Sequence, residues 1–328
     1  MDVMDLNGLQ ALFRVLSGHG YVLVGPTVRD GAIVYDSITA VDDLPKGWGD
    51  AQEPASYSIL LTREESYFNN YVVGPHSWKR FLYPPRVKLF AAEKTGKGFE
   101  FSSPDSEPPK YAFIGVRSCE LQAMAVQDKV FSGEQYADPT YLMRRRQVFV
   151  VAVNCVRPGG NCFCVSMQTG PKAQSGFDLA MTEIVADGQH YFVVESASEQ
   201  GESVLAEVPR RPAGRVDTER ATAATDAAAT HMGKTLTTQN LQKVLNDNLE
   251  HSEWEDVAKR CLACANCTMV CPTCFCSTVE DVTDLSGDHA LWSRAGESDS
   301  FGTHDLNATD PPCRPRCRSH RRSFASST

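Results

Sequence analysis

The sequence has no long hydrophobic run, no excess of basic residues and no internal repeat, and each absence excludes a class of protein. No run approaches the roughly 20 apolar residues of a membrane-spanning helix. The acidic start, Met1 to Asp5, lacks the basic head of a secretory signal. A net charge of −9 is opposite in sign to the surface that nucleic-acid binding needs. We therefore expect a cytoplasmic globular protein with neither nucleic-acid nor membrane partners.

Cysteine is the residue type that stands out in this composition. The chain has 12 cysteines in three groups: four in the middle, six close together, and two near the end. In a reducing compartment, clustered cysteines bind metals or carry out redox chemistry more often than they form disulfides. The groups are Cys119, Cys155, Cys162 and Cys164; Cys261, Cys264, Cys267, Cys271, Cys274 and Cys276; and Cys313 and Cys317.

Hydrophobic patterning predicts an α+β fold. Apolar residues recur at helical spacing over residues 6–16, and short strand-like runs follow. Residues 94–110 are rich in Gly, Ser, Pro and Glu, which predicts a surface loop. Between residues 111 and 153, a strand, a helix and a second strand follow one another. This order is typical of a parallel β–α–β unit, so we expect a partly parallel sheet.

Changes in composition divide the chain into four predicted parts. Residues 1–215 form an α/β domain that carries the four middle cysteines, and residues 216–250 form a helical linker. Residues 251–290 form a small, incomplete ferredoxin-like segment. Residues 291–328 have no hydrophobic periodicity and no Lys, and we predict a disordered, irregular tail.

The strongest motif is C-x2-C-x2-C-x3-C-P, the spacing of bacterial ferredoxins. It comprises Cys261, Cys264, Cys267, Cys271 and Pro272, and we predict that the four cysteines bind a 4Fe–4S cluster. The iron atoms of a cubane lie a few ångströms apart, so thiolates in one tight loop can bind a single cluster. A structural zinc site is the alternative, but such sites usually separate their ligand pairs by about a dozen or more residues.

The cysteines at the end of this motif have less certain roles. In two-cluster ferredoxins, the fourth cysteine of such a run binds the other cluster, so the cluster to which Cys271 belongs is open. Cys274 and Cys276 follow directly. They are either substitute ligands or small buried hydrophobic residues.

The middle cysteines form a second candidate site. Cys119 and Cys155 each follow a predicted strand, and the carboxyl ends of parallel strands share one edge of a sheet. Cys162 and Cys164 lie in the next loop, which can fold back over that edge. We predict that these four thiols bind a second cluster, with a redox-active thiol pair or inert packing as the alternatives.

Cys119 also opens the predicted helix. Ser118 is the expected N-cap, and Arg117 precedes it. We expect the helix dipole and Arg117 to stabilise the thiolate of Cys119.

Several short motifs occur in a fixed order along residues 1 to about 290. They are Gly115-Val-Arg-Ser-Cys119-Glu-Leu, Val151-Ala-Val-Asn-Cys155, Asn161-Cys-Phe-Cys164, Gly176-Phe-Asp-Leu179 and the ferredoxin run through Cys276. Together they resemble the iron–sulfur β-subunit family of cytoplasmic sulfhydrogenases, which is similar to the A-type subunit of anaerobic sulfite reductase. The resemblance implies a 4Fe–4S dicluster electron-transfer subunit. Its place would be between a hydrogenase or reductase catalytic subunit on one side and a NAD(P)-linked flavin subunit on the other.

The chain departs from this family near its end. The family carries a second C-x2-C-x3-C-P-type run downstream, whereas residues 291–328 hold only Cys313 and Cys317 without that spacing. Our hypothesis is a frameshifted or truncated reading frame.

The sequence therefore predicts a non-catalytic iron–sulfur subunit of a soluble hydrogenase or of a sulfur- or sulfite-reductase-type complex. Two alternatives belong to other classes. One is an enzyme that reduces sulfur species at its own middle cysteine site, and the other is a zinc-stapled interaction module.

Overall fold

The computed structural model describes residues 1–53, 56–74, 76–103, 107–133, 136–261, 271–272, 274–275 and 277–296. The chain forms two compact units, and each is built from two separate stretches of sequence. Unit 1 combines Met1–His76 with Pro109–Thr238. Unit 2 combines Ser77–Pro108 with Gln239–Thr328.

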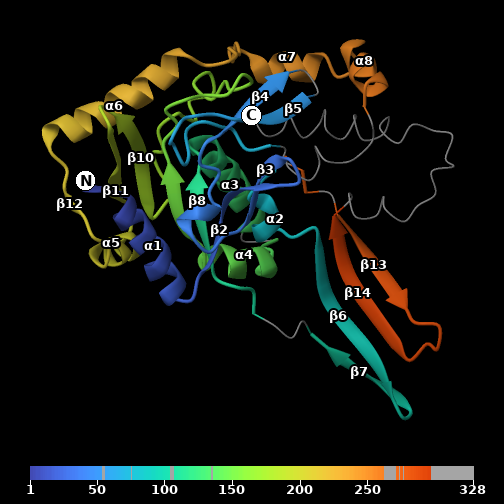
Figure 1. Ribbon diagram of the computed structural model, residues 1–328. Helices are drawn as coiled ribbons and strands as arrows, with labels where there is room; N and C mark the ends of the chain where they lie inside the picture. The colour runs from blue at the N-terminus through green and yellow to red at the C-terminus, as the bar shows by residue number, and fades with distance from the viewer. Residues whose placement is uncertain are drawn as a thin grey trace. The chain divides into compact units, whose positions relative to one another are not determined.

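Unit 1 is centred on an eight-stranded mixed sheet with the order β12-β1-β11-β10-β9-β8-β2-β3 (Figure 1). Strands β2, β8, β9 and β10 are parallel, and the remaining pairs are antiparallel. A separate hairpin joins β4 and β5. The strands are β1 (Asp2–Met4), β2 (Val22–Arg29), β3 (Ala32–Ser37), β4 (Trp48–Glu53), β5 (Ser56–Leu61), β8 (Tyr111–Val116), β9 (Phe149–Val153), β10 (Leu179–Ala186), β11 (Gln189–Ser196) and β12 (Arg211–Pro212).

The predicted β–α–β unit is confirmed. β8 and β9 pair in parallel, and the chain between them forms two helices. All five residues of β9 are buried, as a strand in the middle of a sheet covered on both faces should be. The helices and the short 3-10 turn of unit 1 are α1 (Leu6–Gly18), η1 (Val41–Asp43), α3 (Ser118–Phe131), α4 (Pro139–Arg146), α5 (Glu199–Ala206) and α6 (Arg215–Thr230).

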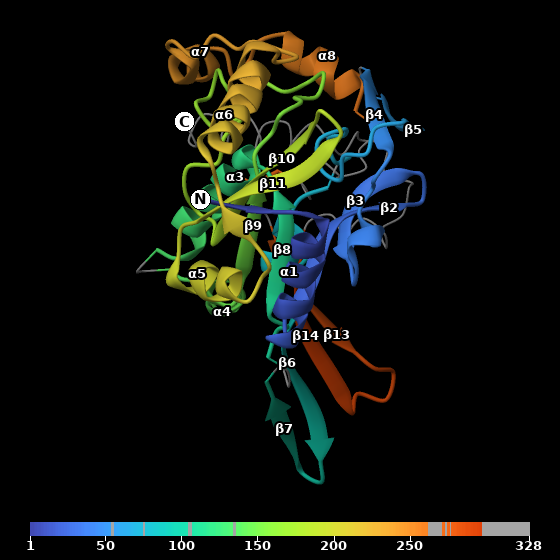
Figure 2. The same cartoon turned by 60° about the vertical axis from the view of Figure 1, so that its left-hand side comes forward.

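Helices cover both faces of this sheet. On one face, Leu12 of α1 and Leu205 of α5 share a buried cluster with Phe149 and Val151 of β9. On the other face, α6 lies beside β10 and β11, as Figure 2 shows, and packs small alanines against Ile184. α6 thus lies within the part of the chain predicted as a helical linker and packs on the sheet of unit 1.

Unit 2 contains a four-stranded antiparallel sheet with the order β13-β14-β6-β7 (Figure 1). The pairing of β14 with β6 joins stretches of chain almost two hundred residues apart, which explains why residues 77–108 cluster with the end of the chain. Its elements are α2 (Lys79–Leu82), β6 (Arg86–Thr95), β7 (Gly98–Ser102), α7 (Leu241–Asp247), α8 (Glu253–Lys259), β13 (Ser277–Thr283) and β14 (His289–Gly296).

The expectation of a loop over residues 94–110 is wrong for its first part. Residues 98–102 form β7, which pairs with the end of β6 through a turn at Gly96, where φ is +58°. Exposed side chains and a glycine turn account for the loop-like composition of this segment, although its backbone hydrogen bonds are those of a hairpin. None of the helices among the described residues combines the length and apolarity that crossing a membrane requires.

We predict that Phe149→Ala destabilises unit 1 by about 3–5 kcal/mol, because it opens a cavity under a strand covered on both faces. Phe149 is fully buried in β9, whereas Phe99 of β7 is 57% exposed. The matched substitution Phe99→Ala should therefore change the free energy of unfolding by less than about 1 kcal/mol. Urea unfolding followed by circular dichroism measures both, and equal effects would contradict this account of the core.

Candidate iron–sulfur sites

The first two middle cysteines lie where the sequence placed them, at the carboxyl edge of the parallel strands. Cys119 is the second residue of α3, directly after β8, and Cys155 follows the end of β9. Because β8 and β9 are parallel neighbours, both residues emerge at the same edge. The N–H of Cys155 donates a hydrogen bond of 3.1 Å to the carbonyl of Pro171, which ties the strand end to the loop that follows.

The loop between β9 and β10 brings the other two thiols back to this edge. Cys119 interacts electrostatically with Cys155, Cys162 and Cys164, and Cys164 interacts with Cys155 and Cys162. The N–H of Gly159 donates to the sulfur of Cys162 at 3.2 Å. The structure thus gathers four thiols from three segments of the chain within electrostatic range of one another.

Three of these thiols, those of Cys119, Cys162 and Cys164, hold their protons more strongly than ordinary cysteines do. Loss of hydration, followed by the negative charges of Glu120 and the other middle cysteines, raises the pKa of Cys119 well above its usual value. Loss of hydration and then the neighbouring thiols raise the pKa of Cys164. Burial also raises the pKa of Cys162, although the hydrogen bond from Gly159 acts in the opposite direction. Ionising any one of the three is therefore unfavourable without a cation.

The expected stabilisation of a Cys119 thiolate is wrong. Arg117, not Ser118, is the N-cap of α3, and the hydroxyl of Ser118 donates to the carbonyl of Lys172 at 3.0 Å. The guanidinium of Arg117 is directed to Cys155, with its Nη1 atom 3.5 Å from the sulfur. Burial, and then the carboxylate of Glu120 on the same helical turn, raise the pKa of Cys119 instead.

The loop over residues 66–69, which no sequence motif indicated, anchors the side chain of Arg117. The guanidinium donates to the carbonyl of Phe68, and its Nη1 atom lies 3.5 Å from Oδ1 of Asn69. The phenyl ring of Phe68 also packs against Gly115 in β8, where an added Cβ would lie 3.1 Å from the ring. Gly115 has a φ of +88° at a register shift in the sheet, a conformation that favours glycine.

The carboxylate of Glu183 in β10 organises this loop. It is fully buried and accepts hydrogen bonds from the Ser66 hydroxyl at 2.6 Å and the backbone N–H groups of Tyr67 and Phe68 at 2.7 and 3.0 Å. The side-chain amide of Asn69 donates at 3.0 Å. The imidazole of His190 lies 2.8 Å from the same carboxylate. A buried carboxylate is stable only with such partners, and this set fixes residues 66–69 against the sheet.

The ferredoxin motif lies in unit 2 and is described in part. Cys261 is exposed, Cys271 is partly buried, and Cys274 is buried. Cys264, Cys267 and Cys276, like Cys313 and Cys317, lie outside the described residues. Lys79, which no sequence pattern connects with this motif, contacts it directly. Its side chain is 6% exposed, and its ammonium donates to the carbonyls of Cys271 and Cys274 at 3.1 and 2.5 Å.

The residues at the edge of β8 and β9 fit a group bound by several thiolates. The other three thiols oppose the ionisation of Cys119, a guanidinium contacts the sulfur of Cys155, and a backbone N–H contacts that of Cys162. In the described part of the chain, no three His, Cys, Asp or Glu side chains converge tightly enough to hold a single metal ion. A cubane differs from one ion because its thiolates bind separate iron atoms, so its ligands surround a larger volume.

Comparison with known proteins identifies the family. A family model for a 4Fe–4S dicluster domain matches residues 260–325. Sulfhydrogenase 2 subunit beta from Pyrococcus furiosus is 31% identical over 246 residues, covering 72% of this chain and 68% of the relative. This chain belongs to the sulfhydrogenase β-subunit family. No solved structure matches it.

The family resemblance seen in the sequence is thus confirmed, and with it the 4Fe–4S dicluster domain. The match to that domain continues through residue 325, so it includes most of the segment that the sequence set apart as an irregular tail. Both tail cysteines, Cys313 and Cys317, fall inside the matched region.

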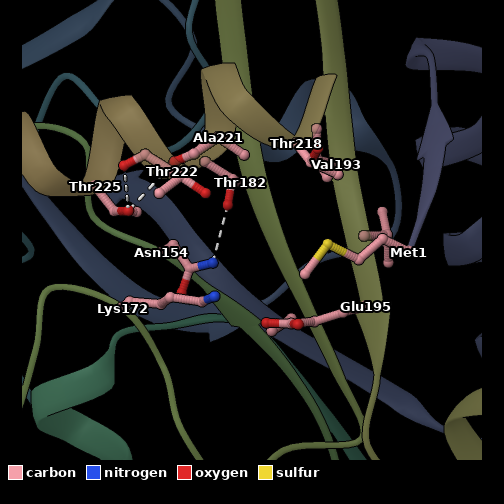
Figure 3. Close-up of a pocket in the computed structure, with 12 residues that line it drawn as sticks. Met1, Asn154, Lys172, Thr182, Val193, Glu195, Thr218, Ala221, Thr222 and Thr225 are labelled. Atoms are coloured by element: carbon pink, nitrogen blue, oxygen red, sulfur yellow. Dashed lines mark hydrogen bonds between the residues drawn. The ribbon is translucent and has the colours of Figure 1, made fainter. Parts of the chain in front are cut away.

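Two of the motif residues in this sulfhydrogenase β-subunit homologue have structural roles. Oδ1 of Asn154 accepts from the N–H of Ala173 at 2.8 Å, and its Nδ2 donates to Thr182 at 2.9 Å, which holds the cysteine loop to β10. Asp178 accepts from the N–H of Val150 and the hydroxyl of Ser198. Figure 3 shows Asn154 beside a polar cavity of about 30 Å³ under α6. This volume suits water and is too small for a substrate.

A short segment after α6, residues 231–236, covers the loop between β9 and β10 that carries Cys162 and Cys164. The N–H of Lys234 donates to the carbonyl of Cys162 at 2.9 Å, and the sulfur of Met232 lies 3.7 Å from that of Cys164. Gly233 lies directly on the loop backbone, since an added Cβ would be 2.3 Å from the carbonyl oxygen of Gly160. We call residues 231–236 the covering segment.

We predict that the iron-free protein alkylates slowly at Cys119, Cys162 and Cys164. A raised pKa leaves a smaller thiolate fraction at any given pH, and the thiolate is the reactive form. The midpoint of the pH–rate profile should therefore lie above about 8.5, the value of a free cysteine. Iodoacetamide labelling quantified by mass spectrometry gives the profile, with circular dichroism as the check on folding. A midpoint below that of a free cysteine would favour a catalytic thiol instead.

We also predict that Gly233→Ala loosens the covering segment. The new methyl group meets backbone atoms, and relieving such overpacking costs about 1–3 kcal/mol. A chelator should then remove iron about tenfold faster than from the wild type, because about 1.4 kcal/mol is a factor of ten. Gly18→Ala in α1 is the matched control, since its Cβ would meet no described atom within 4 Å. Equal rates in the two variants would show that the segment does not shield the cysteines.

Proposed function

We propose that this chain is the iron–sulfur electron-transfer subunit of a soluble, cytoplasmic hydrogenase or of a sulfur- or sulfite-reductase-type complex. It relays electrons between a catalytic subunit on one side and a NAD(P)-linked flavin subunit on the other. The observation that carries the proposal is the gathering of four thiols at one sheet edge, in a chain whose last part matches a dicluster domain. The relative's printed name, subunit beta of a sulfhydrogenase, supports a role within a multi-subunit complex.

Two sets of cysteines hold the clusters in this proposal. Cys119, Cys155, Cys162 and Cys164 bind one in unit 1. In unit 2 the ligands are Cys261, Cys264, Cys267 and Cys271, with Cys274 and Cys276 as further candidates. A bound cluster supplies the gain and loss of one electron, which needs no proton or group transfer from side chains.

The residues of the chain hold and shield these groups. In this proposal iron replaces the protons of the thiols, and its positive charge offsets the loss of hydration and the repulsion that raise the pKa values of Cys119, Cys162 and Cys164. Asn154 and the N–H of Cys155 fix the cysteine loop, and the covering segment limits the access of water to it. Lys79 holds the carbonyls of Cys271 and Cys274 and so fixes the end of the ferredoxin motif.

Catalysis of sulfur reduction by the chain itself has less support. A thiol that attacks a substrate usually has a lowered pKa, whereas the pKa values of Cys119, Cys162 and Cys164 are raised. The isolated chain with an artificial reductant should therefore show no turnover of polysulfide or sulfite.

Iron and acid-labile sulfide counts on anaerobically purified full-length protein test the proposal. We expect at least two clusters, roughly eight irons per chain. Cys155→Ser should lose about four of them without unfolding unit 1. Cys264→Ser should abolish or convert the ferredoxin cluster while leaving the iron at the middle cysteines. Ser175→Ala, an exposed position in the same loop as Cys162, is the control and should keep the full count.

Three results would contradict the proposal. Unchanged iron in Cys155→Ser would remove the middle cysteines from the ligand set. Unchanged iron in Cys264→Ser would count against the ferredoxin assignment. Colourless protein with stoichiometric zinc and no sulfide would establish the zinc-stapled interaction module.

A further inference from the structure

Arg117 places a permanent positive charge against the middle cysteines. Its Nη1 atom lies 3.5 Å from the sulfur of Cys155. A guanidinium stays protonated at any physiological pH. The charge is therefore present whatever the redox state of the group beside it.

The position of this charge is fixed by residues far away in the sequence. The guanidinium donates to the carbonyl of Phe68 and approaches Oδ1 of Asn69. Both residues are held by the buried carboxylate of Glu183 in β10. A long side chain that is anchored at several points keeps one orientation, so its field at Cys155 is constant.

Glu120 supplies a charge of the opposite sign on the same turn of α3. One carboxylate oxygen accepts from the N–H of Arg117 at 2.8 Å, and the other accepts from the hydroxyl of Tyr35. Glu120 directly follows Cys119 in the first turn of α3. The start of α3 thus presents a cation to Cys155 and an anion to Cys119.

We propose that Arg117 is a positioning residue that sets the reduction potential of the group held by the middle cysteines. This inference rests on the proposed function. Gaining an electron makes a thiolate-bound cluster more negative, so a fixed cation stabilises the reduced form and raises the potential. Glu120 opposes it and lowers the potential. The pair makes the middle site an electron acceptor whose potential depends on the field of this chain as well as on its ligands.

Potentiometric titration of the full-length protein, followed by its reduced-state paramagnetic signal, tests the inference. The wave that Cys155→Ser removes identifies the middle site. Arg117→Gln should shift the midpoint potential of this wave to more negative values. We expect at least a tenfold change in the reduction equilibrium constant, which is about 59 mV for one electron. Arg117→Lys keeps the charge and should move it by less than half as much. Glu120→Gln should move it in the positive direction.

Arg145→Gln is the matched control, because Arg145 pairs with Asp128 and its replacement removes the same charge at a different place. It should leave both waves in place, and the wave of the ferredoxin motif should not move in any variant. If Arg117→Gln does not fold, Arg117→Lys and Glu120→Gln still decide. A wave that shifts equally in the lysine and glutamine variants, or that Glu120→Gln leaves unmoved, overturns the inference. If the wild type has no iron that depends on Cys155, the proposed function fails, whereas iron without a shift refutes only the role of Arg117.

Discussion

Loss of hydration, together with repulsion between negative charges, is the constraint that acts on the thiols gathered in unit 1. Four sulfur atoms lie together at one edge of a sheet, and three of them hold their protons more strongly than a free cysteine does. The guanidinium of Arg117 offsets one negative charge, at Cys155. Replacing the protons with iron removes the remaining conflict, because the metal supplies positive charge to every sulfur that binds it.

The fold supplies the rigidity that this charge arrangement needs. Parallel pairing of β8 and β9 sets where Cys119 and Cys155 emerge, and the buried Glu183 fixes the loop that holds Arg117. A buried carboxylate that loses its partners costs several kcal/mol, so the loop cannot leave the sheet without a large loss of stability. The residues that place the cation are therefore also residues that hold unit 1 together. A change at the middle site and a change in the core are coupled through Glu183.

The sequence predicted those features that depend on neighbouring residues. The apolar runs that became β8 and β9 are long enough to identify buried strands, and their order places Cys119 and Cys155 at one edge. It did not predict the direction of Arg117, because the acceptors that orient its side chain, Phe68 and Asn69, lie about fifty residues upstream. Glu183 is a buried charged residue in a mostly apolar strand, and the sequence does not reveal that its hydrogen-bond partners lie in the loop over residues 66–69. The sequence also did not predict which segments form unit 2, because the pairing of β6 with β14 joins residues that most of the chain separates.

Both candidate sites contain a basic side chain, but the two cations contact different kinds of atom. Arg117 contacts a sulfur, so its charge acts directly on the electrons that a cluster would gain. Lys79 contacts the carbonyls of Cys271 and Cys274, so its main effect is on the backbone that aims those cysteines. A guanidinium suits the first role because its planar fork can bind a sulfur and two oxygen acceptors at once. An ammonium suits the second, because a compact charge can lie between two carbonyls of one turn. The cation beside the middle cysteines thus contacts a sulfur, whereas the cation beside the ferredoxin motif contacts backbone carbonyls.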